Sequence, residues 1–238
     1  VYSFAYTKYP EIPHIHLMFP AMYDLTDDGI EGHLAVSLDG VNWARHTEKA
    51  IIPRGKPGEP HEALVYPGPD LIAFPKEGKF RVPVRAGDCF HNKSYNDTFD
   101  KSENGTFFAW AEWTEHRLAG IYAAEEGTFT IGIKCGDRLL ANYRTEPDGW
   151  IKFELIDRVT WPPVEVDGLE GYRFADMQAM SGDETHGIVR WGESDGLPDI
   201  QGQSSIHVRI WLYKATIFSM TMYGADDPGI ADDPRFPL

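Results

Sequence analysis

Apolar and polar residues alternate along much of the first forty positions. In the run H-I-H-L-M-F at 14–19, the apolar residues Ile15, Leu17 and Phe19 occupy every second position, and the run 34–38 repeats this pattern. A period of two indicates a β-strand, because successive side chains of a strand point to opposite faces of the sheet. The turn formers T-D-D-G follow the first run and D-G follows the second, so the sequence predicts a β-hairpin.

The second half of the chain shows the same periodicity in strand-like runs with turn signals between them. The expected strands are Thr128–Lys134, Arg138–Thr145, Trp150–Asp157, Thr185–Trp191 and Ser205–Tyr223. The last run is long enough for two strands that meet near Lys214, and a turn is expected at P-D-G in 147–149. Repeated short strands with such turns predict a β-sandwich, and no helix longer than one or two turns is expected.

The segment 37–43, S-L-D-G-V-N-W, is more specific than a general hairpin. A strand that ends in S-x-D-G-x-x-W recurs in blades of carbohydrate-active β-propellers. Around it stand, in order, V-Y-S-F-A-Y-T-K-Y-P, H-L-M-F-P-A-M-Y and A-L-V-Y-P-G-P-D-L-I. This order resembles the last blades of five-bladed propeller proteins related to glycoside hydrolase families 32 and 43, the invertase-like enzymes. The later strands resemble the β-sandwich that follows that propeller.

The resemblance implies an all-β chain made of two β-propeller blades followed by a β-sandwich. The blades would span 1–117, the sandwich 118–223 and an irregular surface tail 224–238. Two blades alone form an open arc with unpaired strand edges, which other strands must cover. The expected partners are therefore an upstream propeller chain of the same precursor or sister subunits.

Glycoside hydrolysis requires two carboxyl groups that flank the scissile bond. In the resembled families the catalytic acids come from early blades, which this chain lacks, so its catalytic residues stay unknown and hydrolysis by this chain alone is not expected. The alternative is a non-catalytic secreted glycoprotein that uses the scaffold to bind carbohydrate or another small ligand, or to assemble subunits. The sequence contains no G-x-S-x-G elbow, P-loop or dinucleotide fingerprint.

The candidate substrate-binding residues follow from the resemblance. His61 and Glu62 precede the innermost strand of the second blade, Tyr66 lies further along it, and Tyr2 and Ser3 would line the same central channel. A carboxylate at such a position can accept hydrogen bonds from a sugar diol. The simpler interpretation is that His61 and Glu62 are exposed link residues and that Tyr2 and Ser3 pack within the blade.

Two further groups of polar residues are candidates for a ligand pocket or a metal site. The long insert 88–105 holds His91, which could reach over a pocket mouth, although a solvated loop is the simpler interpretation. His14 and His16 lie on one face of a strand, where two imidazoles could share a metal, but the spacing identifies no third ligand. The sequence therefore predicts no metal site and no cofactor.

Composition narrows the possible partners. The formal net charge is −15 and the isoelectric point is near 4.9, so no excess of Lys and Arg is present to neutralise the phosphates of a nucleic acid. The negative charge does not exclude neutral sugars or basic proteins as partners. No run of eighteen apolar residues occurs, and a membrane partner is therefore not expected.

Three N-x-S/T sequons lie close together, at Asn92, Asn96 and Asn104. Such a group predicts glycosylation and a secreted, extracellular protein, with a polar loop rich in Asn, Ser and Thr as the alternative. The two cysteines, Cys89 and Cys135, could form one disulfide, and the sequence leaves open whether they do.

Overall fold

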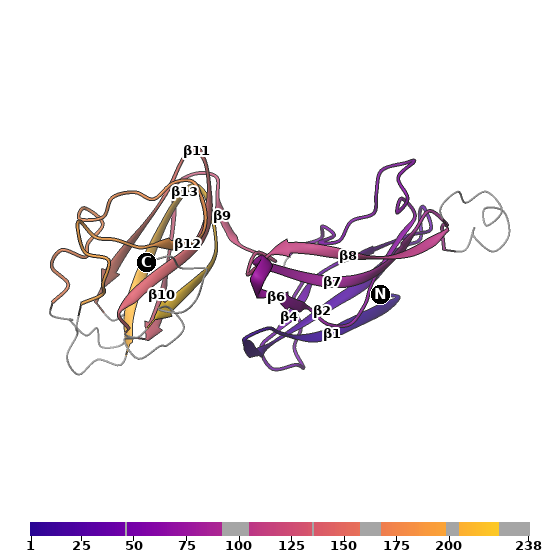
Figure 1. Ribbon diagram of the computed structural model, residues 1–238, viewed down its shortest axis with the longest axis horizontal. Helices are drawn as coiled ribbons and strands as arrows, with labels where there is room; N and C mark the ends of the chain where they lie inside the picture. The colour runs from indigo at the N-terminus through magenta and orange to yellow at the C-terminus, as the bar shows by residue number, and fades with distance from the viewer. Residues whose placement is uncertain (46, 92–104, 135, 158–167, 199–204, 224–238) are drawn as a thin grey trace. The chain divides into compact units, whose positions relative to one another are not determined.

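The structure is a computed structural model that describes residues 1–45, 47–91, 105–134, 136–157, 168–198 and 205–223 (Figure 1). Apart from one 3-10 turn, every regular element in these ranges is a β-strand, which confirms the all-β class. The chain divides into two compact units, Val1–Leu118 and Ala119–Leu238. The parts of the chain that the structure describes contain no helix with the length and hydrophobicity of a membrane span.

Unit 1 contains an eight-stranded sheet built from two antiparallel meanders (Figure 1). The first meander comprises β1 (Ser3–Tyr9), β2 (Ile12–Asp24), β3 (Gly29–Gly32) and β4 (Ala35–Ser37); the second comprises β5 (Leu64–Pro67), β6 (Ile72–Phe74), the 3-10 turn η1 (Pro75–Glu77), β7 (Lys79–Gly87) and β8 (Thr106–Thr114). In the first, β2 pairs with β1 along one edge and with β3 and β4 along the other. In the second, β7 pairs with β5 and β6 along one edge and with β8 along the other. One parallel pair, Ile30 with Leu64, joins β3 to β5.

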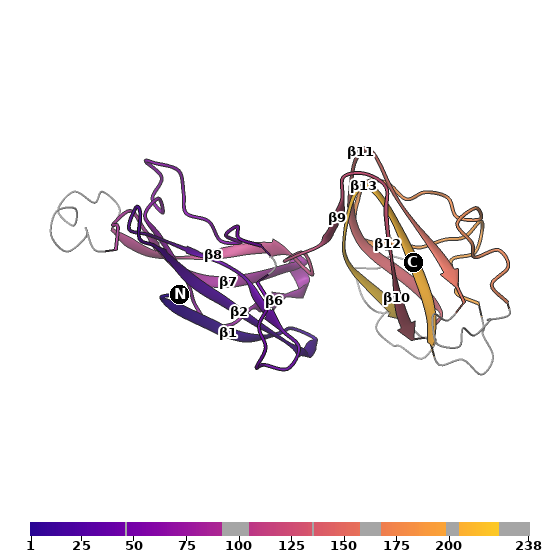
Figure 2. The same cartoon turned by 180° about the vertical axis from the view of Figure 1, so that it is seen from behind.

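The core of unit 1 lies between the two meanders, which curl toward each other (Figures 1 and 2). Fully buried Phe19 of β2 and Phe80 of β7 belong to this one apolar cluster, and the ring of Phe19 stacks on Trp113 of β8 at 6.3 Å. On β1 the small Ala5 is buried, whereas Phe4 is 67% exposed. The strand period was therefore predicted correctly, but the bulky face of β1 points away from the core.

Separate propeller blades form separate sheets. In unit 1 the strands are joined into a single sheet, so the structure does not confirm the two expected blades.

The predicted turn after β4 forms as its sequence requires. The carboxylate of Asp39 accepts hydrogen bonds from the backbone N–H of Val41 at 2.8 Å and of Asn42 at 2.7 Å, and the Ser37 hydroxyl donates to it at 2.9 Å. These bonds hold the pKa of Asp39 well below its usual range. Gly40 adopts a φ of 72°, which glycine reaches without strain. Trp43 then contacts the edge of the Tyr6 ring on β1, with the ring centroids 6.2 Å apart.

Unit 2 is a five-stranded antiparallel sheet (Figure 2). Its strands are β9 (Ile121–Ala123), β10 (Gly127–Lys134), β11 (Arg138–Ile156), β12 (Asp183–Ile188) and β13 (Ser205–Tyr223). The long β13 is central: it pairs with β11 along one edge and with β10 and β9 along the other. The expected Ser205–Tyr223 run is thus one strand, with an irregularity at Lys214, whose φ is 44°.

The prediction of a turn at 147–149 is wrong, because these residues lie inside β11. The register with β13 moves from Thr145 opposite Ala215 directly to Trp150 opposite Tyr213, so the residues between them bulge from the ladder. A Cβ at Gly149 would lie 2.3 Å from the carbonyl oxygen of Lys214, and only glycine permits this close approach. The two strands expected on either side are therefore one continuous strand.

One face of this sheet and the segment that crosses it enclose the core of unit 2. Phe153, Val208 and Ile210 are fully buried, and Leu169 from the crossing segment packs in the same cluster. The indole N–H of Trp191 donates a 2.9 Å hydrogen bond to the carbonyl oxygen of Phe153. The strands described for this unit form one sheet, so a two-sheet sandwich is not confirmed.

Candidate functional site

A tight turn at 26–29 joins β2 to β3 and carries two adjacent acidic side chains. The backbone N–H of Asp28 donates to the carbonyl oxygen of Asp24 at 2.9 Å, and the Asp27 carboxylate accepts from the N–H of Gly29 at 3.0 Å. Asp28 has a φ of 71°, a conformation that Asp tolerates better than most residues. The turn buries Asp28 to 8% exposure and leaves Asp27 partly exposed.

Four aromatic side chains gather beside this turn, and together they are called the tyrosine cluster: Tyr2, Tyr23, Tyr66 and His91. The ring of Tyr2 contacts the ring of His91 at 4.7 Å and that of Tyr66 at 5.7 Å, between centroids. Tyr23 contacts Tyr2 at 6.4 Å and His91 at 5.3 Å, each in an edge-to-face arrangement. The cluster therefore joins the start of the chain, the end of β2, β5 and the segment after β7.

Hydrogen bonds tie the cluster to the acidic turn. The Tyr23 hydroxyl donates to the Asp28 carboxylate, and the backbone N–H of His91 donates to the Asp28 carbonyl oxygen at 3.1 Å. The Tyr66 hydroxyl oxygen lies 3.2 Å from Nδ1 of His91. Burial, together with the nearby Tyr2, raises the pKa of Tyr66 to about 12. Its phenol therefore keeps its proton, and can donate a hydrogen bond, throughout the physiological pH range.

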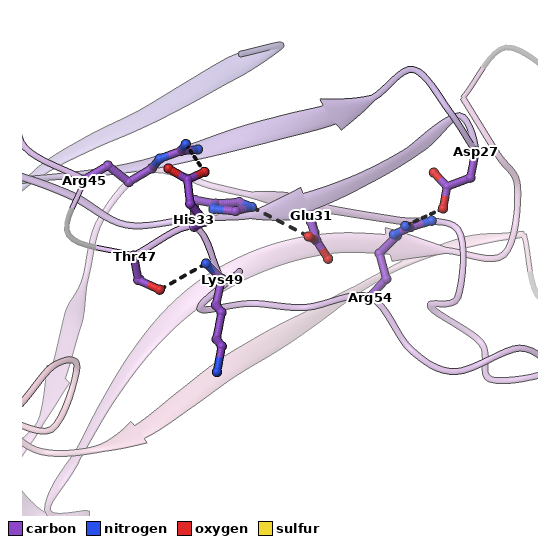
Figure 3. Close-up of polar contacts among 8 residues, drawn as sticks. Asp27, Glu31, His33, Arg45, Thr47, Lys49 and Arg54 are labelled. Atoms are coloured by element: carbon purple, nitrogen blue, oxygen red, sulfur yellow. Dashed lines mark hydrogen bonds and ion pairs between the residues drawn. The ribbon is translucent and has the colours of Figure 1, made fainter. Parts of the chain in front are cut away.

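A partly buried arginine, Arg54, supports the turn. Arg54 donates to the Asp27 carboxylate at 2.6 Å, with its side chain 19% exposed (Figure 3). This hydrogen bond lowers the pKa of Asp27, so Asp27 stays charged well into the acidic range. Directly after β3, Nε2 of the buried His33 lies 3.6 Å from the Glu31 carboxylate (Figure 3). The pair with Arg54 thus fixes the position of the Asp27 carboxylate on the turn.

The structure brings together two of the five predicted binding residues. Tyr2 and Tyr66 contact each other through their rings. Ser3 is half-buried and pairs with Ala21 in the sheet. The contacts found for His61 and Glu62 stay within the turn at 55–62: His61 Nε2 lies 4.0 Å from Glu59, and Glu62 accepts from the backbone N–H of Gly58.

Three residues of this region were not predicted as binding residues: Tyr23, Asp28 and His91. Tyr23 ends the motif H-L-M-F-P-A-M-Y, and Asp28 belongs to the T-D-D-G turn of the expected hairpin. For His91 the sequence offers two interpretations, a residue over a pocket mouth or part of a solvated loop. Each carried a local signal, but nothing in the sequence spacing indicates that the three meet.

Several predicted features lie outside the described residues. These are the sequons at Asn92, Asn96 and Asn104, and also Cys135, the potential partner of Cys89. Cys89 itself is a free, buried thiol.

Comparison of the chain with protein-family models, curated proteins and solved structures finds no match.

Proposed function

We propose that the chain is part of an invertase-like, glycoside hydrolase-like carbohydrate-active protein, and that the tyrosine cluster together with Asp28 contacts a sugar. The observation that carries this proposal is the contact between Tyr2 and Tyr66, two residues that the resemblance places along one channel. Aromatic faces pack against the apolar faces of sugar rings, while phenol hydroxyls and carboxylates exchange hydrogen bonds with sugar hydroxyls. Both kinds of group occur side by side here.

The finer fold assignment belongs to the same proposal. Each meander of unit 1 would correspond to one propeller blade, with β1 and β5 as the innermost strands, and unit 2 to the following β-sandwich. Two features support it. Within the described strands, the two meanders share one residue pair of the sheet, and the ring of Tyr2, directly before β1, contacts the ring of Tyr66 on β5. In a propeller, innermost strands line the central channel, where ligands bind.

Within this proposal the chain recognises sugar without cleaving it alone. We place the two catalytic carboxyl groups on the early blades, which the resemblance assigns to an upstream chain of the same precursor. Asp28 would then orient sugar hydroxyls through hydrogen bonds and would not take part in bond cleavage.

Binding of sucrose and short neutral oligosaccharides to the intact chain, measured by isothermal titration calorimetry, tests the proposal. Tyr2 is 54% exposed, so Tyr2→Ala removes a ring without opening the core, and we expect at least a tenfold loss of affinity. Phe108→Ala is the matched control, because Phe108 is an 87% exposed ring on β8 and should leave binding unchanged. Equal effects of the two substitutions, or no sugar binding by the wild-type chain, would contradict the assignment.

A second candidate function is subunit assembly by a non-catalytic secreted glycoprotein. Within the described residues, β1 pairs only with β2 and β8 only with β7, so both strands have an open edge. Large rings are exposed on both: Phe4 at 67%, Phe108 at 87% and Trp110 at 52%. Open edges with exposed aromatic residues favour association with another chain.

Sedimentation velocity of the purified chain separates the two candidates. Assembly predicts a concentration-dependent oligomer that Phe108→Ser together with Trp110→Ser dissociates while sugar affinity is kept. Mass spectrometry of the native protein would show whether Asn92, Asn96 and Asn104 carry glycans. A monomer without glycans would remove this second candidate.

A further inference from the structure

A second group of polar side chains lies apart from the tyrosine cluster, at the turn between β1 and β2 and at the turn that follows β8. Glu11 occupies the first turn, and Glu115 and His116 the second. One ligand atom from each of the three lies within 4.8 Å of the others. Nε2 of His116 is 3.6 Å from the Glu11 carboxylate. The fold thus brings together three potential metal ligands from segments about a hundred residues apart.

The imidazole of His116 is oriented by a neighbour outside the three. The Tyr9 hydroxyl oxygen lies 3.0 Å from Nδ1 of His116, and the two rings stack at 5.8 Å. The edge of Phe80 closes a further side at 5.1 Å. With Nδ1 engaged by Tyr9, the other ring nitrogen faces the carboxylates. Metal-binding histidines are commonly held in this way, because a fixed ring and tautomer present Nε2 to the ion.

The position of Tyr9 suits this role. Its hydroxyl oxygen, 3.0 Å from Nδ1 of His116, can accept a hydrogen bond from Nδ1–H, and the lone pair of Nε2 then lies on the side of the Glu11 carboxylate.

The three side chains differ in their exposure to solvent. Glu115 is 3% exposed, whereas the side chain of Glu11 is 58% exposed and that of His116 is 20% exposed. A buried carboxylate gives a fixed ligand, and the exposed Glu11 gives an ion a route from solvent. Two carboxylates this close also concentrate negative charge, which a divalent cation neutralises.

We propose that Glu11, Glu115 and His116 bind a divalent first-row transition metal ion, with Zn²⁺ as the representative. The donor set decides the class of ion. Imidazole nitrogen combined with carboxylate oxygen suits Zn²⁺ and its neighbours, whereas Ca²⁺ and Mg²⁺ prefer sites made of oxygen alone.

The position of the site gives the ion a structural consequence. β1 ends the sheet order in unit 1 on one side, and β8 pairs with β7 near the other; Glu11 and His116 each come two residues after one of these strands. An ion held by both turns would tie the ends of the curled sheet together. Since the unfolded chain does not hold these ligands together, the ion should stabilise the folded state.

The direct test uses the untagged full-length chain and Zn²⁺ alone, with affinity measured by calorimetry and stability by thermal unfolding. We expect Zn²⁺ to raise the melting temperature, and Glu11→Gln and His116→Gln each to weaken binding at least tenfold and to abolish the rise. His14→Gln and Glu48→Gln are the controls, because each removes an exposed side chain of the same type elsewhere in unit 1. If the controls weaken binding as much as the site variants do, the metal binds elsewhere and the proposal is wrong.

Two further measurements guard against variants that simply misfold. Co²⁺ bound in place of Zn²⁺ should give a visible spectrum without sulfur-to-metal charge transfer, which excludes the cysteines as ligands. Tyr9→Phe keeps every ligand but removes the hydroxyl that orients His116, so we expect affinity to fall about tenfold to a hundredfold with the fold retained. Unchanged Zn²⁺ affinity in Tyr9→Phe would overturn the role of Tyr9, and a thiolate spectrum would overturn the site.

Discussion

The two units use the same strand periodicity in opposite ways. In β13 of unit 2, Ile206, Val208 and Ile210 occupy alternate positions and are almost completely buried. In β1 of unit 1 the alternation is equally regular, but the small Ala5 is buried while the rings of Phe4 and Tyr6 are exposed by 67% and 46%. In β13 of unit 2 the bulky residues are therefore buried in the core, whereas in β1 of unit 1 the bulky residues lie at the surface.

This difference indicates separate roles. Long strands with a continuous apolar face, as in β11 and β13, give unit 2 a broad core. In unit 1 the strands are mostly short, and polar or aromatic groups gather at the turns, as in the tyrosine cluster. We therefore expect unit 2 to act as a stable scaffold and unit 1 to make the contacts with ligands or partner chains.

The largest expected effect comes from substituting one phenylalanine in each unit. Phe153→Ala empties a fully buried position in unit 2, and we expect it to lower the free energy of unfolding by about 3–5 kcal/mol. Phe4→Ala removes an exposed ring of β1 and should change it by less than about 0.5 kcal/mol. Urea unfolding followed by circular dichroism measures both. A large loss in Phe4→Ala would mean that the ring is covered in the folded protein, and the comparison would fail.

A smaller effect is expected in the alkaline titration of Tyr66. Because burial raises its pKa from 10.0 to about 12, the folded state keeps the proton more strongly than the unfolded state. The stabilisation is therefore complete below pH 10 and is lost as the pH rises toward 12. NMR of ¹³C-labelled tyrosines can follow the titration, with Tyr66→Phe to assign the resonance. A midpoint near 10 would show that Tyr66 lies open to water.

The smallest effect concerns one ion pair in each unit. Asp27→Asn breaks the pair with Arg54 in unit 1, and we expect a loss of up to about 1 kcal/mol at neutral pH. Because the pKa of Asp27 is lowered in the folded state, this contribution is present above the ordinary carboxyl pKa and disappears as the pH falls through the lowered value.

The matched variant is Asp183→Asn in unit 2, whose pair with Arg144 is similarly short at 2.7 Å but exposed on both sides. It should cost less, because water and salt screen an exposed pair. Urea unfolding of both variants at neutral and acidic pH checks the order. A larger loss in Asp183→Asn would reverse it.

The turn chemistry and the strand period were predictable from the sequence because both act over a few neighbouring residues. The turn from Ser37 to Trp43 formed as its residues require. The turn expected at 147–149 did not, because pairing along β13 kept both sides in one strand. Tertiary pairing thus overrode a strong local signal, and in unit 1 the pairing of β3 with β5 joined the two meanders into one sheet.

The sequence by itself determined that the chain is built of strands, where most of them lie, and which residue types were available for binding. Only the tertiary structure decided which face of each strand is buried, since alternation defines two faces but not which one meets the core. It also decided that Tyr2 meets His91 and that Glu11 meets His116. Such contacts depend on how distant strands curl and pair, and this is set by the packing of the whole sheet, which no local spacing encodes.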